Sequence, residues 1–431
     1  MSKRFRSWDV DQNWLLPPSV HDFVPAGHAA HLVRDAVRET LDLEEVYESY
    51  VGERGQPPYH PGMMVALLLY GYSCGVYSSR RIARACEERV DFMAVSGLER
   101  PDFRTISDFR KRHLEALAGL FRQVLALCRE AGLVKLGHVA LDGTKIKANA
   151  SKHKAMSYGR MGKAEKKLEA EVRGWLEQAE ATDAREDGEH GEEARGDEMP
   201  EWVADKQQRL ERIREAKEAL EAQARAKGKT GKSEGEPRPA EKAQRNFTDP
   251  ESRILKTGDG FIQGYNAQAA ADAGHQVIVA HGLTDSSSDQ KQLRPMIEAM
   301  EEEAGALPTE LSADAGYCSE DNLAILKERG IRGSVATGRQ KHGTATAAGG
   351  RASPPGSLRE AMAGRLKQGG RRSRYRLRKV TIEPVFGQIK HARGFRQFLL
   401  RGLDQVRHEW ALVCIAHNFN KLAAHRVSAQ A

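Results

Sequence analysis

The stretch "HVALDGTKIKANAS", residues 138–151, marks the point where the chain changes from helical to strand patterns. Its apolar run, Val139-Ala140-Leu141, predicts a short buried strand, which delivers Asp142 into a turn. An ionised carboxylate at a buried position is costly unless a cation or hydrogen-bond donors accompany it. The stretch therefore predicts that a sheet begins here. It also predicts a partner for Asp142, which could be a lysine, a metal ion or water.

Residues 20–136 carry helical patterns. Pro61 stands where a helix start tolerates proline, and Ser78 or Ser79 is a suitable N-cap for the next helix. Apolar residues from Ile106 to Cys128 recur at helical spacing. Short helices with a basic second helix are compatible with a DNA-reading helix-turn-helix, although many all-α domains share this pattern. We expect residues 1–136 to form a helical N-terminal DNA-binding domain that folds alone. Its expected DNA contacts are Arg80, Arg81, Arg84, Arg104, Arg110, Lys111 and Arg112.

A charged segment interrupts the strand pattern over residues 152–245. A helical stripe runs through Leu210, Ile213, Lys217 and Leu220, and the surrounding sequence is rich in helix formers. The stretch from 228 to 239 is typical of a disordered linker. The segment predicts a helical hairpin or an arm that faces a partner, and a dispensable spacer is an equally good interpretation.

Strand patterns resume after this insertion. Residues 259–285 predict a hairpin that turns at Ala273-Gly274-His275. A helix over 289–305, a short strand before Asp314, another helix and a last strand in "IRGSVAT" follow. Residues 338–374 predict a mobile basic loop, and helices are expected over 375–424. This order predicts an α/β fold in which a mixed sheet is flanked by helices.

The charge of the chain indicates a polyanionic partner. The chain of 431 residues has a net charge of +7, and residues 371–401 carry ten Lys and Arg against one acid, Glu383. Such a surface is typical of nucleic-acid binding, or it is simply a solvated, solubilising face. No apolar stretch reaches the roughly 18–20 residues of a membrane span. Because the five cysteines show no spacing typical of disulfides or zinc, we expect a cytoplasmic protein.

Two further acids accompany Asp142. Asp314 also follows a short apolar strand, and Glu383 would share a helix face with Gly387 and Lys390. Pro384 disfavours helical geometry at Glu383 and predicts a helix start or a kink there. Each acid alone has an ordinary explanation in turn chemistry, ion pairing or helix capping. Together, three converging carboxylates would make an oxygen-only site suited to Mg²⁺ or Mn²⁺, and a pair of such ions supports phosphoryl transfer.

A family resemblance is carried by stretches spread over nearly the whole chain, among them "YHPGMMVALLLYGY", "SSRRIARACEERVDFMAVSG", "LDGTKIKANAS", "SADAGYCSEDN" and "YRLRKVTIEPVFGQIKHARGFRQFLLRG". These stretches resemble DDE transposases of bacterial insertion sequences. The resemblance implies a helical N-terminal domain and a ribonuclease-H-like catalytic domain over 137–424, interrupted by the insertion 152–245. It also implies that Asp142, Asp314 and Glu383 are the catalytic and metal-binding acids.

The resemblance extends to residues around the last acid. The family's Tyr, Arg, Glu and Lys signature falls on Tyr375, Arg378, Glu383 and Lys390. Four residues separate Arg378 from Glu383, where related groups have three. With Arg393 in the same basic segment, Tyr375, Arg378 and Lys390 are the expected DNA contacts of this region.

The implied activity is that of a nucleoid-associated transposase. It would cut at the ends of its element with water as nucleophile and join the freed 3′-OH to target DNA. The implied cofactor is Mg²⁺, two ions, for which Mn²⁺ could substitute. The partners would be the terminal inverted repeats, target DNA and a second copy of the chain. Two alternatives remain: a non-catalytic, sequence-specific DNA-binding regulator, and a metal-dependent nuclease on the same fold that does not join.

Several other polar residues have simpler interpretations. Asn266 and Gln268 alternate on one strand face, and a local hydrogen-bonding role is favoured over a contact with DNA. Asp289, with the nearby Asp285, is expected to make a turn and cap the following helix. Two lysines that follow Asp142, at positions 145 and 147, could contact phosphate, although a local role is again simpler.

Overall fold

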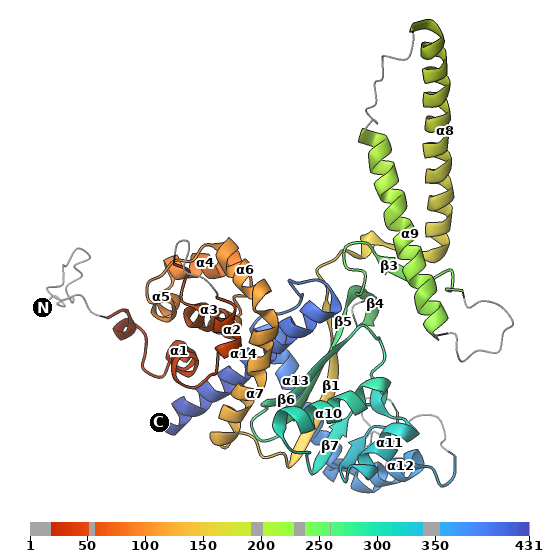
Figure 1. Cartoon of the computed structure of the whole chain (residues 1–431). Coiled ribbons are helices and arrows are strands. Elements are labelled where there is room, and N and C mark those ends of the chain that lie inside the picture. The colour runs from red at the N-terminus through yellow and green to blue at the C-terminus, as the bar shows by residue number, and fades with distance from the viewer. Residues whose placement is uncertain are drawn as a thin grey trace, which may run out of the picture.

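The computed structural model describes residues 19–50, 57–190, 201–227, 238–258, 260–338 and 354–430. A mixed sheet forms the body of the molecule, helices from both ends of the chain lie beside it, and a long helical arm extends away from it (Figure 1). The predicted α/β class is confirmed. In the part of the chain that these ranges cover, no helix is long and apolar enough to cross a membrane.

The region before the sheet is helical. In the described ranges its helices are α1 (Ala29–Glu39), α2 (Glu44–Glu48), α3 (Pro61–Ser73), α4 (Ser79–Glu88), α5 (Val90–Ser96), α6 (Phe103–Arg112) and α7 (Leu114–Glu130). The helical spacing predicted from Ile106 to Cys128 is present, and it is divided between α6 and α7, which are separated at His113. The buried ring of His113 lies against those of Phe109 and Tyr50, with centroids 4.6 and 5.7 Å away. This packing fixes the break between α6 and α7.

The main sheet is mixed, as predicted. Its strands are β1 (His138–Lys147), β4 (Arg253–Thr257), β5 (Gly260–Asp272), β6 (Ile278–Thr284), β7 (Glu310–Ala313) and β8 (Arg332–Val335). The long strand β5 pairs antiparallel with β1, β4 and β6, whereas β7 lies parallel to both β1 and β8. The strand β4 was not predicted.

The first strand is longer than the sequence suggested. Its residues 143–147 continue to pair with β5, with Gly143 opposite Gln268 and Lys147 opposite Gly264. Asp142 therefore lies inside a strand, and the prediction of a turn directly after it is wrong. The apolar run had marked only the half of the strand that is buried on both sides.

The later helices are α10 (Leu293–Ala304), α11 (Glu320–Glu328), α12 (Leu358–Gly369), α13 (Leu377–Gly387) and α14 (Leu403–Gln430). Both α10 and α14 contact β6, and α13 contacts β1. The helix α12 falls within the predicted mobile loop 338–374, so that prediction is wrong for residues 358–369. Residues 339–353 of the same loop lie outside the described ranges.

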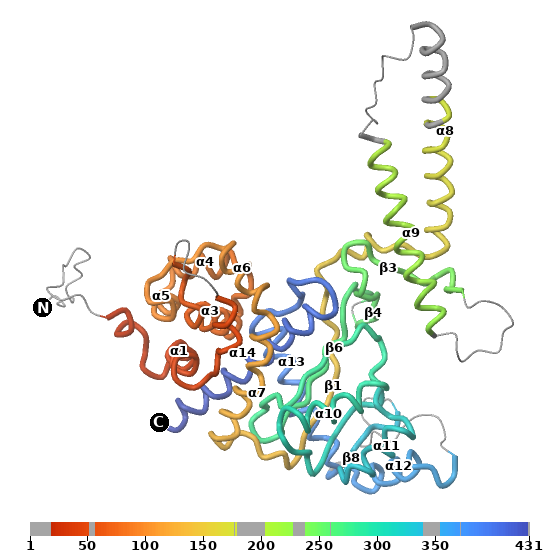
Figure 2. The backbone as a smooth tube through the Cα atoms, in the orientation of Figure 1, coloured from red at the N-terminus to blue at the C-terminus, as the bar shows by residue number. Residues whose placement is uncertain are grey.

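The C-terminal helix α14 joins the N-terminal helices to the sheet. It packs against α3 and α7 and also against β6 (Figure 2). On the sheet side, the buried Trp410 donates its indole N–H to the carbonyl of Gln268 at 2.9 Å. On the other side, Asn420 donates to the carbonyl of Ser73 in α3 at 3.0 Å. One hydrophobic core thus includes residues from both regions, which is at odds with the expectation that residues 1–136 fold alone.

The insertion has a core of its own. The helices α8 (Tyr158–His190) and α9 (Glu201–Lys227) pack together above a small sheet made of β2 (Ala155–Ser157) and β3 (Gln244–Asn246). Met161 and Ile213 are among its buried residues. Lys217, which the sequence placed in the apolar stripe, forms an ion pair with Glu165 at 2.8 Å. The pair of helices projects from the body (Figure 1), and most of the predicted linker, residues 228–237, lies outside the described ranges.

Candidate active site

Asp142 lies on β1 at the level where β7 ends. Leu141 pairs with Ala313, the last residue of β7, so the strand extends past its neighbour from Asp142 onward. The Asp142 side chain is 14% exposed. Its Oδ1 accepts the N–H of Gly143 at 2.9 Å, and its Oδ2 accepts a bond from Arg378 Nη2 at 2.6 Å. The carboxylate is therefore buried, and in this structure an arginine is its partner.

Asp314 follows β7 directly. Because β7 and β1 are parallel and Leu141 lies opposite Ala313, Asp142 and Asp314 occupy the next level of the two strands. The Oδ1 atom of Asp314 accepts the N–H of Gly316 at 2.8 Å, which caps the short 3₁₀ turn that follows the strand. The register of two parallel strands thus brings these aspartates to one edge of the sheet.

Glu383 comes from α13, the helix that packs against β1. Arg378, on the same helix, donates from Nη1 to Glu383 Oε1 at 3.3 Å, while its Nη2 binds Asp142. One guanidinium thus joins two of the three predicted acids. The Glu383 side chain is 49% exposed, whereas that of Arg378 is 12% exposed. The glutamate therefore forms the open side of the site.

Pro384 lies inside α13, so of the two predicted alternatives, a helix start or a kink at Glu383, the helix start is wrong. Proline cannot bond the carbonyl four residues earlier, which belongs to Val380. That carbonyl instead accepts a bond from Gln276 Nε2 at 2.9 Å. A side chain from the turn between β5 and β6 therefore satisfies the group that the proline leaves free. After Gly387 the helix continues as a π-helical turn over Gln388–Ala392, a distortion that is frequent at functional sites.

The two aspartates are hard to ionise. Burial raises the pKa of Asp142 to about 7; Arg378 opposes this rise, and the negative charges of Asp314 and Asp289 add to it. Burial likewise raises the pKa of Asp314, again against the effect of Arg378. The site thus brings carboxylates together in surroundings from which water is largely excluded. A bound cation would lower the free-energy cost of ionising them there.

Asp289 is a fourth carboxylate of the site, and the sequence interpretation missed it. It precedes a short 3₁₀ turn, but its side chain makes no capping bond there, so the predicted cap is wrong. Its Oδ1 instead accepts bonds from Asn266 Nδ2 at 2.7 Å and from Gln268 Nε2 at 2.9 Å. Tyr317, buried after β7, donates its hydroxyl to the Gln268 oxygen. The predicted local hydrogen-bonding role of Asn266 and Gln268 is confirmed, and its purpose is to hold Asp289.

Two glycines leave the room that Asp289 occupies. A Cβ at Gly143 would lie 2.6 Å from Asp289 Oδ1 and 2.4 Å from Gln268 Nε2. A Cβ at Gly316 would lie 3.2 Å from Asp289 Oδ2. Asp289 therefore sits between the residue after Asp142 and the turn after Asp314. No spacing in the sequence links Asp289 to either glycine. Only the strand register, which places Gly143 opposite Gln268, could have indicated that Asp289 belongs to the site.

Comparison with known families identifies two parts of the chain. Residues 18–112 match the family described as Transposase domain (DUF772), and residues 349–423 match the Transposase DDE domain. Both matches are to transposase families, and together they support a DDE transposase of an insertion sequence. No curated protein and no solved structure shows significant similarity to it. The second match includes Arg378 and Glu383, whereas Asp142 and Asp314 lie outside both matches.

DDE transposases use divalent metal ions, and the donor chemistry of this site fits such an ion. Oxygen donors from carboxylates are the ligands that Mg²⁺ and Mn²⁺ prefer. Within the described ranges, no three acidic, histidine or cysteine side chains lie close enough to hold one ion together. Arg378 instead supplies the positive charge between Asp142 and Glu383. Its buried Nε has no hydrogen-bond partner, so the guanidinium is not fully satisfied where it stands.

Most of the predicted contacts in the N-terminal part of the transposase are exposed. These residues are Arg80, Arg81, Arg84, Arg104, Lys111 and Arg112, on α4 and α6. Arg110 differs, because it is 5% exposed and donates to the carbonyl of Tyr77 at 3.0 Å. Its burial contradicts the predicted DNA contact, and the residue instead ties α6 to the turn before α4.

The predicted DNA contacts near Glu383 also differ in their surroundings. Tyr375 is partly buried beside the acids, and Lys390 donates to the carbonyl of Lys145 on β1 at 2.8 Å. Arg393 is directed at His417 of α14, with Nη2 2.9 Å from Nδ1, and its Nη1 is buried. Arg393 thus contacts α14 in this structure, and its DNA contact stays a prediction.

Proposed function

We propose that this transposase cuts DNA at the ends of its element and transfers the freed 3′-OH into target DNA. The observation that carries the proposal is that Asp142 and Glu383 pair with one arginine, Arg378, while Asp314 lies at the same level of the neighbouring parallel strand and interacts electrostatically with that arginine. Three segments far apart in the sequence supply these side chains. Ordinary turn or capping chemistry, which could explain each acid alone, does not require them to meet.

The sheet supports a ribonuclease-H-like catalytic domain. Its path β6-β5-β1 is antiparallel, and its continuation β1-β7-β8 is parallel, with the first acid on the central strand. The insertion α8–α9 leaves this order intact, because it enters and leaves the sheet through the separate strands β2 and β3. We assign residues 137–424 to this domain, interrupted at 152–245.

Asp142, Asp314 and Glu383 would hold two Mg²⁺ ions, for which Mn²⁺ could substitute. When bound, such a pair stabilises the attacking and leaving oxygens of a phosphoryl transfer. The Gly143 and Gly316 N–H groups orient the two aspartates. Asp289 adds a partly buried negative charge behind them and acts as a positioning residue. Arg378 holds Asp142 and Glu383 together in this structure.

The chemistry comprises two displacements at phosphorus. In the first, water attacks the phosphate at an element end, the bond to the 3′ oxygen breaks, and this oxygen leaves as a hydroxyl after taking up a proton. In the second, the freed 3′-OH loses its proton and attacks a target phosphate, which releases a target 3′-OH. The exposed cations of α4 and α6 would recognise the terminal repeats, and a second copy of the chain would hold the second end.

The test uses a plasmid that carries the gene with its flanking DNA on both sides. We expect nicks at the flanking repeats and joined products when Mg²⁺ or Mn²⁺ is present, and neither product in EDTA. Nicking without joining would indicate a nuclease instead. Specific binding with neither product would indicate a non-catalytic DNA-binding regulator.

A further inference from the structure

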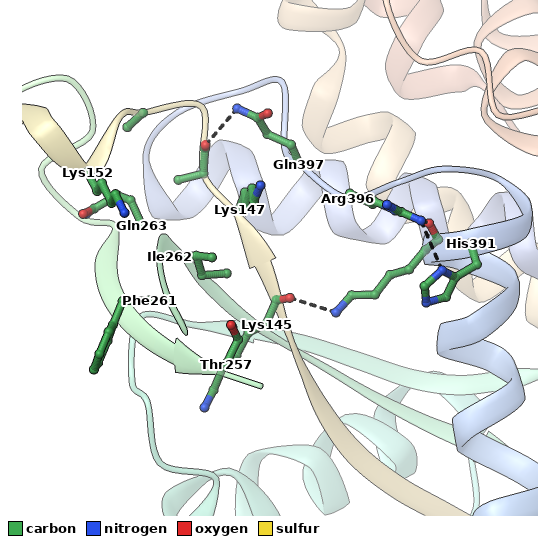
Figure 3. Close-up of a pocket in the computed structure, with 13 residues that line it drawn as sticks. Lys145, Lys147, Lys152, Thr257, Phe261, Ile262, Gln263, His391, Arg396 and Gln397 are labelled. Atoms are coloured by element: carbon green, nitrogen blue, oxygen red, sulfur yellow. Dashed lines mark hydrogen bonds between the residues drawn. The ribbon is translucent and has the colours of Figure 1, made fainter. Parts of the chain in front are cut away.

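A basic pocket lies on β1 beyond the acids. It has a volume of about 600 Å³ and opens between β1, the β4–β5 hairpin and the segment that follows α13 (Figure 3). We call it the β1-end pocket. Its lining residues that carry charge or a ring are Lys145, Lys147, Lys152, Phe261, Lys390, His391 and Arg396.

The charge of the β1-end pocket is of one sign. Its lining holds five Lys and Arg side chains and, among the described residues, no Asp or Glu. Lys145 Nζ donates to the carbonyl of Lys256 at 2.9 Å, and Lys390 Nζ donates to the carbonyl of Lys145 at 2.8 Å. Backbone carbonyls orient these ammonium groups without neutralising them. Such a pocket attracts a polyanion.

One wall of the β1-end pocket is aromatic and open to water. Phe261, near the start of β5, is 61% exposed, although it is a large apolar side chain. Exposed aromatic rings beside cations are typical of single-stranded nucleic-acid sites, where bases stack on the ring and the cations follow the backbone. A base that is paired and stacked in a duplex does not offer its face. The ring therefore favours an unpaired nucleotide as occupant.

The strand sets the distance from this pocket to the acids. Lys145 and Lys147 follow Asp142 by three and five residues, so a rise of about 3.3 Å per residue places them roughly 10 and 17 Å along β1. One DNA strand advances by about 3.4 Å per nucleotide, so this span corresponds to about three to five nucleotides. Side chains alternate along a strand, so Lys145 and Lys147 point to the face of the sheet opposite to that of Asp142. Lys390, which also lines the pocket, interacts electrostatically with Asp142, so the pocket lies within a few nucleotides of any phosphate held at the acids.

We propose that the β1-end pocket binds the DNA strand that leads away from the cut, with its phosphates on the lysines and an unpaired base on Phe261. The position of the cut rests on the proposed function, whereas the binding chemistry of the pocket does not. Opening of the duplex next to the cut would supply the unpaired base.

The test measures binding of the full chain, without divalent ions, to a fluorescein-labelled oligothymidylate of about ten nucleotides and to a duplex of the same length. Phe261→Ala should weaken binding of the oligothymidylate about tenfold, because stacking contributes on this scale, and should leave binding of the duplex unchanged. Phe261→Trp should restore the affinity, and its additional fluorescence should fall when the oligothymidylate binds. Phe23→Ala is the matched control, since Phe23 is 60% exposed and lies outside the pocket.

Unchanged binding of the oligothymidylate by Phe261→Ala would overturn the proposal. An equal loss for both DNAs would also overturn it, because the pocket would then be a clamp for duplex phosphates. The assay needs neither metal nor cleavage, so a chain that failed to cut DNA would still give the expected result. Conversely, if the chain cut DNA but Phe261→Ala bound the oligothymidylate as wild type does, only the proposed role of the pocket would be refuted.

Discussion

The two halves of β1 carry opposite chemistry on one continuous strand. Around Asp142, carboxylates are held by side chains and glycine N–H groups, and a network through Gln268 and Tyr317 fixes Asp289. Around Lys145, ammonium groups are held by backbone carbonyls alone. The carboxylates of the acidic half thus share one cation, Arg378, whereas the ammonium groups of the basic half have no carboxylate partner among the described hydrogen bonds. A strand with the proposed cation site at one level and the proposed phosphate site a few residues later suits a DNA chain that follows it.

The largest effect should come from Asp142→Asn, which tests the acidic half. We expect cleavage to fall by about 10⁴-fold, as for removal of an essential group from an active site. DNA binding should be unchanged or slightly tighter, because a negative charge near the phosphates is lost. Asp314→Asn should behave alike.

The measurement for these two variants is the nicking rate in Mg²⁺ together with DNA affinity in EDTA. Asp285→Asn is the matched control, since Asp285 pairs with Arg253 at 3.1 Å outside the site. Near wild-type nicking by Asp142→Asn would show that the acidic half does not take part in catalysis.

Glu383→Gln should reduce cleavage by at least about 100-fold, because a neutral amide is a poor ligand for a hard cation. Glu383 lies within α13 and its side chain is half exposed, so an isosteric glutamine should not change folding. If the glutamate only oriented Arg378, glutamine would still accept that bond and activity would survive. Single-turnover cleavage separates the two roles, with Glu328→Gln on an exposed face of α11 as control. Near-normal cleavage would exclude Glu383 from the metal-binding acids.

The sequence predicted the strands before Asp142 and Asp314 better than what surrounds these residues. Short apolar runs locate Asp142 and Asp314, because parallel strands are buried on both faces. The second half of β1 was lost because its residues alternate between faces, and the pairing partner that extends it lies over a hundred residues away. Asp289 and Arg110 show the same limit. Their sequence positions, in a loop and in a basic helical segment, predict exposed side chains. Tertiary packing instead brings Asp289 to the site and buries Arg110.

Packing between distant segments also decided the larger features. The apolar face of the last helix was predictable, but its partners were not. Trp410 reaches the sheet while Asn420 reaches α3, so the boundary drawn at residue 136 divides one core. The helix α12 stayed hidden within a stretch rich in Gly and Arg. Composition describes such a stretch on average, whereas an N-cap such as Ser357 acts locally.

Asp289→Asn tests whether the acidic half needs its fourth charge. Asparagine can still accept the bonds from Asn266 and Gln268, so the network should persist while the charge is lost. We expect the affinity for Mn²⁺ to fall about 10- to 100-fold, the scale of outer-shell effects at metal sites, with DNA affinity unchanged. The Mn²⁺ dependence of the melting temperature measures this without any turnover, and Asp285→Asn is again the control. An unaltered Mn²⁺ response would leave Asp289 a purely structural residue.

The smallest effect should come from Lys147→Gln in the basic half. Lys147 is exposed at the end of β1, so its loss should not disturb the fold. Each phosphate contact to a single strand contributes about 0.7 to the slope of log affinity against log salt, so the slope should fall by about that amount. Lys367→Gln, on the exposed face of α12, should leave the slope unchanged. Titrations of the oligothymidylate at several salt concentrations decide the matter. Equal slopes for wild type and Lys147→Gln would mean that the DNA strand does not follow β1 past the acids, and the contrast between its two halves would lose its functional meaning.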